Sequence, residues 1–129
     1  MKVGRNVTLP GSLRMALEAV LGAPVSHVRI IEHSLYARLH LRAIATTRRR
    51  RIYLRGSAED FFDDPWLMLH EYCHVLQQWE PGDLTLLRYC LECLRNGYWN
   101  NRFEVAARAF ADRHAHALRA AHPSNASRR

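Results

Sequence analysis

The chain has 129 residues, of which 48% are hydrophobic and 24% are charged, and its formal net charge is +7 with a pI near 10.0. This length predicts one domain spanning residues 1–129 with a single modest core, and the hydrophobic share excludes a disordered chain. There is no apolar run of about 18 residues and no visible signal peptide, so we expect a cytoplasmic protein. Export by a route that needs no N-terminal signal stays open.

The first third of the chain predicts an arm, a helix and a strand. Residues 1–11 are expected to form an extended arm, and Ser12 is expected to cap a helix that ends at Gly22. Residues 27–32 show the alternation of a short strand, and residues 34–41 fit a short helix.

Two short segments, residues 43–46 and 51–54, are expected to pair as strands with an arginine run at the tip of the hairpin: Arg48, Arg49, Arg50 and Arg51. A cluster of this kind fits an acidic substrate or a phosphate backbone, so a nucleic-acid-associated factor is one alternative. No helix-turn-helix or zinc-finger pattern accompanies it, and a solvated turn explains it too. Residues 56–64 are expected to form an acidic loop.

The next segment predicts a mostly buried helix. Asp63 or Asp64 can cap it, Pro65 suits the first helical position, and Glu80-Pro81-Gly82 ends it. Apolar residues recur over four predicted turns between these limits. Ionisable side chains in the middle of such a helix are costly unless they are paired or bind a metal.

Such side chains are present, because this helix carries His70-Glu71-Tyr72-Cys73-His74, an HExxH motif. On a helix the two histidines project about 40° apart and one turn of roughly 6 Å along the axis, so both imidazoles can reach one metal ion. Glu71 projects beside them and is better placed to hold a water molecule than to bind the metal. This arrangement is typical of a zinc-activated hydrolase with a glutamate base.

A catalytic zinc site of this kind needs a third protein ligand. We favour Glu104, at the start of a second helix that Asn100 or Asn101 can cap and that continues to about residue 120. Alanines surround Glu104 and permit a close approach of two helices; the apolar stripe is Phe103, Ala107, Phe110 and His114 or Ala117. The alternative is a first-turn carboxylate that only complements the helix dipole. Other available ligands are Glu92, Asp112, His114 and His116.

The three cysteines are too few for a disulfide framework. Cys90 and Cys93 form a CxxC pair on a predicted apolar helix over residues 83–95, where we expect them to pack as small hydrophobic residues rather than bind a metal. Cys73 could in principle touch the metal, but packing against a neighbouring helix is favoured. Residues 123–129 read as a polar tail.

The run His70-Glu71-Tyr72-Cys73-His74-Val75-Leu76-Gln77-Gln78, followed by Glu104 in a Glu-x-x-Ala helix, resembles the gluzincin branch of the zincin metallopeptidases. It is more closely similar to a compact bacterial group marked by HExxH-Val-x-Gln-Gln. The resemblance spans roughly residues 25–118 and implies that His70, His74 and Glu104 bind Zn²⁺ and that Glu71 acts as general base and acid. Arg108 stands where larger gluzincins often carry an Asp that supports a histidine, so that support must come from elsewhere or be weaker.

The predicted elements make an α+β domain, and the resemblance implies a minimal zincin-like one: an N-terminal helix, a small twisted β-sheet, the HExxH helix and C-terminal helices. We therefore expect zinc-dependent hydrolysis of a peptide or protein substrate, in which Glu71 activates a zinc-bound water. Three side chains are candidates to stabilise the oxyanion: Tyr98, His114 and His116.

Residues 51–54 are nominated as the edge strand that aligns the substrate by main-chain pairing, and Arg51 and Arg55 beside it would favour acidic substrates. Besides the nucleic-acid alternative, a zinc-binding interaction module without turnover remains a second alternative to the peptidase.

Overall fold

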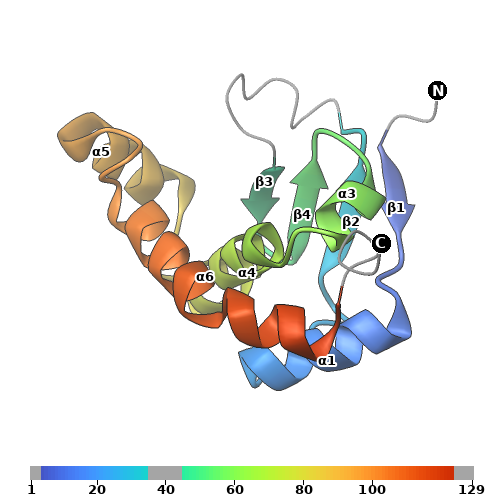
Figure 1. Cartoon of the computed structure of the whole chain (residues 1–129). Helices are drawn as coiled ribbons and strands as arrows, with labels where there is room; N and C mark the ends of the chain where they lie inside the picture. The colour runs from blue at the N-terminus through green and yellow to red at the C-terminus, as the bar shows by residue number, and fades with distance from the viewer. Residues whose placement is uncertain (1–3, 35–44, 124–129) are drawn as a thin grey trace.

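The computed structural model describes residues 4–34 and 45–123, which form an α+β domain (Figure 1). The strands are β1 (Arg5–Val7), β2 (Arg29–Glu32), β3 (Ala45–Arg48) and β4 (Arg51–Leu54). The helices are α1 (Gly11–Leu21), α3 (Ala58–Phe62), α4 (Pro65–Cys73), the π-helix η1 (His74–Trp79), α5 (Leu86–Asn96) and α6 (Arg102–Ala121). Among the described residues, no helix combines the length and the apolar character needed to cross a membrane.

The four strands form one mixed sheet in the order β1-β2-β4-β3. β1 is antiparallel to β2, β2 is parallel to β4, and β3 is antiparallel to β4. The predicted hairpin is confirmed, with Arg48 opposite Arg51 and a turn at residues 49–50. The nomination of residues 51–54 as the edge strand is wrong, because β4 lies inside the sheet and β3 forms its edge. Edge position depends on long-range pairing, which no local pattern in the sequence encodes.

The predicted arm joins the sheet through β1, at the edge opposite β3. The first helix, α1, follows directly and buries Leu13 and Leu17 against the core. Its end at Gly22 is confirmed, because this glycine has φ 67° and its N–H bonds the carbonyl of Glu18. The predicted Ser12 cap is wrong, since the helix starts after Pro10 without a side-chain cap.

The segment expected to be an acidic loop over residues 56–64 contains the short helix α3 instead. The Ser57 hydroxyl accepts a hydrogen bond from the Asp60 N–H and caps this helix, and Phe61 is buried beneath it. The helix predicted over residues 34–41 falls almost entirely on residues 35–44, which lie outside the described residues.

Helix α4 lies between the sheet and α6, which cover it from two sides (Figure 1). One hydrophobic core joins these layers: Ile30, Ile52 and Leu54 from the sheet, Met68, Leu69 and Tyr72 from α4, and Ala111, Ala115 and Leu118 from α6. Full burial of a large apolar side chain contributes about 1.5–3 kcal/mol, so this packing fixes α4 relative to α6. The alanines of α6 are small enough to let α4 come close.

The two C-terminal helices are confirmed, with the Asn101 side chain capping α6 by accepting from the Phe103 N–H. The α6 stripe begins at Phe103 and Ala107 as predicted, but the structure continues it through Ala111, Ala115 and Leu118. Helix α5 differs more, because none of its residues is buried although its sequence suggested an apolar helix packed on the body.

Candidate metal centre

The start of the HExxH helix is as predicted. The Asp64 carboxylate accepts from the Leu67 N–H at 3.0 Å, and Pro65 occupies the first helical turn. The α-helix ends at Cys73, however, and the chain continues as a π-helix through Trp79. The N–H of Glu80 accordingly bonds the carbonyl of Val75, five residues back, at 3.0 Å. Such π-helical turns within helices often mark functional sites.

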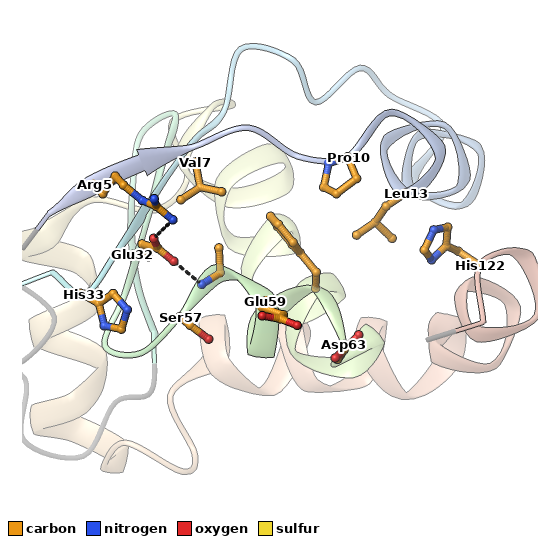
Figure 2. Close-up of a pocket in the computed structure, with 12 residues that line it drawn as sticks. Arg5, Val7, Pro10, Leu13, Glu32, His33, Ser57, Glu59, Asp63 and His122 are labelled. Carbon is orange, nitrogen blue, oxygen red and sulfur yellow. Dashed lines mark hydrogen bonds and ion pairs between the residues drawn. The ribbon is translucent and has the colours of Figure 1, made fainter. Parts of the chain in front are cut away.

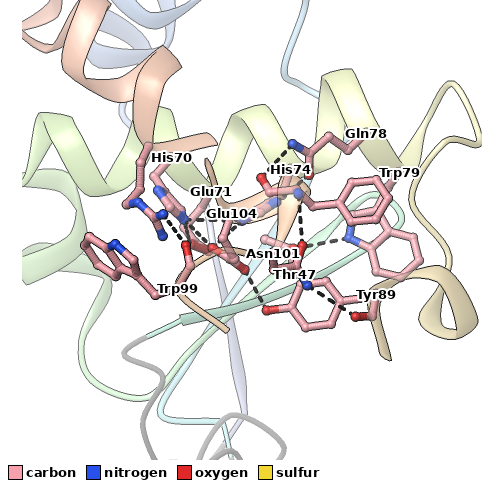
Figure 3. A network of polar contacts seen from close by, with 12 residues as sticks. Thr47, His70, Glu71, His74, Gln78, Trp79, Tyr89, Trp99, Asn101 and Glu104 are labelled. Atoms are coloured by element: carbon pink, nitrogen blue, oxygen red, sulfur yellow. Dashed lines mark hydrogen bonds and ion pairs between the residues drawn. The ribbon is translucent and has the colours of Figure 1, made fainter. Parts of the chain in front are cut away.

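Three predicted ligands meet at one point, as Figure 3 shows. The Nε2 atom of His70 lies 3.0 Å from Oε1 of Glu104, and Nε2 of His74 lies 3.2 Å from the same oxygen. The two Nε2 atoms are 3.2 Å apart. All three residues are 4–6% exposed, so the cluster is buried between α4, η1 and α6. The sequence-based choice of Glu104 over the other acids therefore has the expected geometry.

The size of this triangle fits zinc. Tetrahedral ligand atoms at about 2.0–2.1 Å from Zn²⁺ are about 3.3–3.4 Å from one another. The observed separations of 3.0–3.2 Å are slightly shorter and need only small movements to match. Two imidazole nitrogens and one carboxylate oxygen are also the donor set that catalytic zinc sites use.

Gln78 sets the tautomer of His74. The Gln78 Nε2 donates to the Phe103 carbonyl at 2.9 Å, which directs Oε1 of the same amide at Nδ1 of His74, 2.6 Å away. An amide oxygen only accepts, so Nδ1 of His74 carries a proton, and in the neutral ring the Nε2 lone pair then faces the centre. Gln78 is the last residue of the Val-x-Gln-Gln run. The run by itself does not indicate that this glutamine bonds a histidine.

Tyr89 orients Glu104 from helix α5. Its hydroxyl donates to Oε2 of Glu104 at 2.7 Å, leaving Oε1 to face the two histidines. This residue was also missed, because nothing in the sequence relates it to a carboxylate fifteen residues later. Gln78 thus orients one of the two histidines, and Tyr89 orients the carboxylate. Among the described buried atoms, Nδ1 of His70 has no hydrogen-bond partner.

The charges in the centre are strongly coupled. Burial alone would raise the pKa of Glu104, but hydrogen bonds from His70 and His74 hold that pKa well below its ordinary range. Burial alone would lower the pKa of His74, but the bond to Glu104 and the charge of Glu71 raise it. Acceptor atoms that face one another at this distance need a cation between them. Either a proton on an imidazole or a metal ion meets that need.

Glu71 is set back from the triangle. Its Oε1 lies 3.9 Å from Nε2 of His70, against 3.0 Å for Glu104. It is 5% exposed, and His70, Glu71 and His74 together form a group of buried side chains with potential ligand atoms within 4.8 Å of one another. Burial raises the pKa of Glu71, although the two histidines oppose the shift. Glu71 therefore lies beside the triangle, farther from His70 than Glu104 does.

The three candidates for stabilising an oxyanion differ in their distance along the chain from the centre. His114 and His116 lie ten and twelve residues beyond Glu104 on α6, which places them about 15–18 Å along the helix axis, too far from the centre. Tyr98 remains by elimination; it is 58% exposed, and partial burial together with the charges of Glu104 and Glu71 raises its pKa to about 12. The aromatic ring that packs on His70 is that of Trp66, with ring centroids 5.0 Å apart.

Arg108 contacts Trp99 rather than a histidine. Its guanidinium lies 3.8 Å from the centroid of the Trp99 ring and donates to the Trp99 carbonyl. The departure from the gluzincin pattern at this position therefore has a local structural role.

The remaining candidate ligands lie elsewhere. Asp112 accepts from the indole of Trp66 at 2.8 Å, and Glu92 accepts from the Arg102 N–H at 3.1 Å. Cys73 is buried in α4, and burial raises the pKa of its thiol to about 11. The expectation that the CxxC pair packs in the interior is wrong for Cys90, which is exposed, and holds only partly for Cys93.

The edge strand β3 contacts the helix that carries the centre. The indole of Trp79 donates to the Thr47 hydroxyl at 3.2 Å, and the Arg48 guanidinium lies 5.8 Å from the centroid of the Trp79 ring. Burial lowers the pKa of Arg48. Arg49 and Arg50 are exposed in the turn, so the predicted arginine cluster divides between a packed and a solvated part.

A separate cavity of about 510 Å³ lies between β1, the end of β2, α3 and the end of α6 (Figure 2). Its most buried acid, Glu32, pairs with Arg5 and accepts from the Ala58 N–H at 2.8 Å. None of the four residues of the candidate centre lines it. The cavity is therefore separate from the candidate metal centre. Its buried acid is already paired within the fold.

Comparison with known proteins gives one relationship. A family model described as the eCIS core domain matches residues 8–82. The match includes the HExxH motif and the Gln-Gln pair but ends before α5 and Glu104. A search of the curated proteins and one of the solved structures found no match. The matching model is not that of a zincin family, so the likeness to gluzincins rests on the HExxH run and Glu104. Because the match covers more than half of its residues, the chain belongs to the eCIS core domain family.

Proposed function

We propose that this domain is a zinc-dependent hydrolase of peptide bonds. The observation that carries the proposal is the convergence of His70, His74 and Glu104 within 3.0–3.2 Å of one another, with Glu71 set back beside them. Structural zinc sites are usually closed by four protein ligands, whereas catalytic sites use three and keep one position open. Three donors and one adjacent carboxylate match the catalytic pattern.

His70, His74 and Glu104 would hold the zinc ion. A bound ion supplies an electrophile that polarises a substrate carbonyl and makes a water molecule more acidic. Gln78 keeps the Nε2 lone pair of His74 directed at the centre, and Tyr89 keeps Oε1 of Glu104 there.

Glu71 takes the proton of the attacking water and passes it to the leaving amine. General bases work best when their pKa lies near the operating pH, and burial shifts the pKa of Glu71 upward, in that direction. Tyr98 is the nominated side chain left to donate to a developing oxyanion, because His114 and His116 lie too far along α6.

The edge strand β3 is the surface on which an extended substrate would align. Within the described sheet its outer edge is unpaired, and main-chain pairing at such an edge binds extended peptides in any sequence context. The Thr47–Trp79 bond fixes β3 relative to η1. Arg49 and Arg50 at the hairpin tip would favour acidic residues in the substrate.

A second candidate function is a zinc-binding interaction module without turnover. The family name refers to extracellular contractile injection systems, which points to a multi-protein assembly. A module of this kind would use the same three ligands for structural stability and would not need Glu71 as a base.

The variant Glu71→Gln separates the two functions. Zinc content is measured by mass spectrometry of the native protein, and cleavage is measured by mass spectrometry of a random peptide library. For a peptidase, Glu71→Gln retains one zinc per chain and lowers the cleavage rate at least about hundredfold. The matched control is Glu59→Gln on α3, which lies away from the centre and should leave both quantities unchanged.

Two results would contradict the peptidase. One is unchanged cleavage by Glu71→Gln, which would remove Glu71 from the mechanism. The other is full zinc occupancy without cleavage of any library peptide by the wild-type chain, which would favour the interaction module. Loss of zinc in Glu104→Gln is expected under both functions and tests the ligand set alone.

A further inference from the structure

Helix α5 exposes a row of leucines. Leu87 is 70% exposed, Leu94 is 83% exposed and Leu91 is 38% exposed, and none of the residues of this helix is buried. Leu86, at the start of the helix, is 53% exposed. Large apolar side chains gathered on one element of a water-exposed surface usually mark an interaction site. We call Leu87, Leu91 and Leu94 the leucine face.

The leucine face is not used to hold α5 on the domain. The contacts of α5 with the rest of the chain come from another side of the helix, through Tyr89, Glu92 and Cys93. These residues bond Glu104, Arg102 and Asn101 at the start of α6. Figure 1 shows α5 at one end of the molecule, beyond the sheet and away from α1. The leucines are therefore available to another molecule without any unfolding.

The spacing of the leucines suits a second helix. Leu87, Leu91 and Leu94 follow one another by four and three residues, which is the spacing of the a and d positions that form the seam of a coiled coil. The helix has 11 residues, or about three turns, so the seam is short. A short seam of this kind favours one docked helix over an extended surface such as a bilayer.

Charge identifies the kind of helix. Arg88 and Arg95 each follow a seam leucine by one residue and lie along one flank of the leucine face. Arg88 keeps its position through bonds to the carbonyls of Gly82 and Asp83. The one acid of α5, Glu92, is turned to α6, where it accepts from the Arg102 N–H. This flank of the leucine face is therefore positive, in a chain with net charge +7.

A second copy of the chain is a poor occupant. Antiparallel pairing of two α5 helices would bring Arg88 and Arg95 of one copy against the same residues of the other, and like charges beside a seam oppose association. A helix with acidic residues beside its apolar seam meets the same flank with favourable charges.

We propose that the leucine face of α5 docks an amphipathic helix of another protein, whose apolar seam is flanked by Asp and Glu. The surface lies outside residues 8–82, which match the family model, so it is not part of the segment that the family shares. The inference does not depend on zinc or on catalysis.

The probe is a designed helical peptide of about three heptads, with Leu at the a and d positions and Glu at e and g. A second peptide carries Lys in place of every Glu. Binding to the full chain is measured by fluorescence anisotropy at two salt concentrations. The acidic peptide should bind at least about tenfold more tightly than the basic one, and added salt should weaken it.

Two variants of the chain locate the surface. Leu91→Glu combined with Leu94→Glu should weaken binding of the acidic peptide at least about tenfold, whereas Met15→Glu, at an apolar position on α1 that is 66% exposed, should not. Arg95→Glu should weaken binding of the acidic peptide and strengthen binding of the basic one. Because no residue of α5 is buried, these variants should keep the circular dichroism and zinc content of the wild type.

Three results would overturn the inference. The first is equal binding of both peptides, or binding that survives the double leucine variant. The second is a wild-type dimer in sedimentation that the double variant dissociates, which would make the leucine face a contact between copies. The third is binding to anionic phospholipid vesicles that competes with the acidic peptide, which would make it a membrane contact.

Discussion

Helices α4 and α5 have similar lengths and opposite surroundings. Of the nine residues of α4, seven are buried, whereas α5 has 11 residues and buries none. The sequence of α4 is apolar nearly all round because the sheet and α6 cover it, and its ionisable residues gather at the candidate centre. The sequence of α5 is strongly two-sided, yet its apolar side faces solvent. An amphipathic pattern therefore indicates a partner without showing whether that partner belongs to the same chain.

The largest expected effect tests this contrast directly. Leu69→Ala removes a fully buried side chain of α4 and should lower the free energy of unfolding by about 3 kcal/mol. Leu94→Ala on α5, at 83% exposed, should change it by no more than about 0.5 kcal/mol. Urea unfolding followed by circular dichroism measures both. Comparable losses would mean that α5 packs on the domain in solution.

The junction between the two regions depends on Asn101, which is fully buried. Its side chain accepts from the Phe103 N–H and donates to the Tyr89 carbonyl and the Cys93 sulfur. Asn101→Ala should cost about 2 kcal/mol and speed amide hydrogen exchange in α5 more than in α4. Asn96→Ala, on the exposed end of α5, is the control. Equal acceleration in both helices would show that α5 is not a separate unit.

Tyr89 is the residue of α5 that contacts the candidate centre. Tyr89→Phe removes the bond to Glu104, so the chain should bind zinc about tenfold more weakly. Competition with a chromophoric chelator measures this affinity, and Tyr98→Phe is the matched control. If Tyr89→Phe binds zinc as the wild type does, the two regions are energetically independent at the metal centre.

The smallest effect lies at the opposite edge of the molecule, where Glu32 joins β2 to α3 and β1. Its bond from the Ala58 N–H, together with Arg5, lowers the pKa of Glu32 below its ordinary value of 4.5. A lowered carboxyl pKa stabilises the fold at neutral pH, and this contribution is lost as pH falls below about 4.5. Glu32→Gln should cost about 1 kcal/mol at pH 7, and the difference from wild type should shrink towards pH 3. A pH-independent difference would show that Glu32 acts through packing alone, and Glu59→Gln serves as the control.

Local signals were the predictable part of this fold. Asp64 with Pro65, Gly22 and Asn101 mark helix limits through backbone chemistry that lies within a few residues, and the structure confirms each. The choice of Glu104 followed from one helix register and the small residues around it. Its distances to the two histidines agree with that reasoning.

The features that the sequence did not predict depend on contacts between residues far apart in the chain. The order of the strands placed β4 inside the sheet and left β3 at the edge, and no pattern within either strand distinguishes them. Tyr89 reaches Glu104 only because α5 folds back on the start of α6. The helix α3 was missed because its acidic composition outweighed the Ser57 cap, although the cap is a local signal.

The π-helical turn limits the length of the motif. Its N–H groups bond five residues back, so η1 accommodates more residues per turn than an α-helix. Deleting one residue between His74 and Gln78 would rotate that glutamine by one residue step around the axis, away from the imidazole it now holds. Homologous sequences that keep both glutamines should therefore show no insertion or deletion in this interval, which makes the spacing itself a marker for alignment.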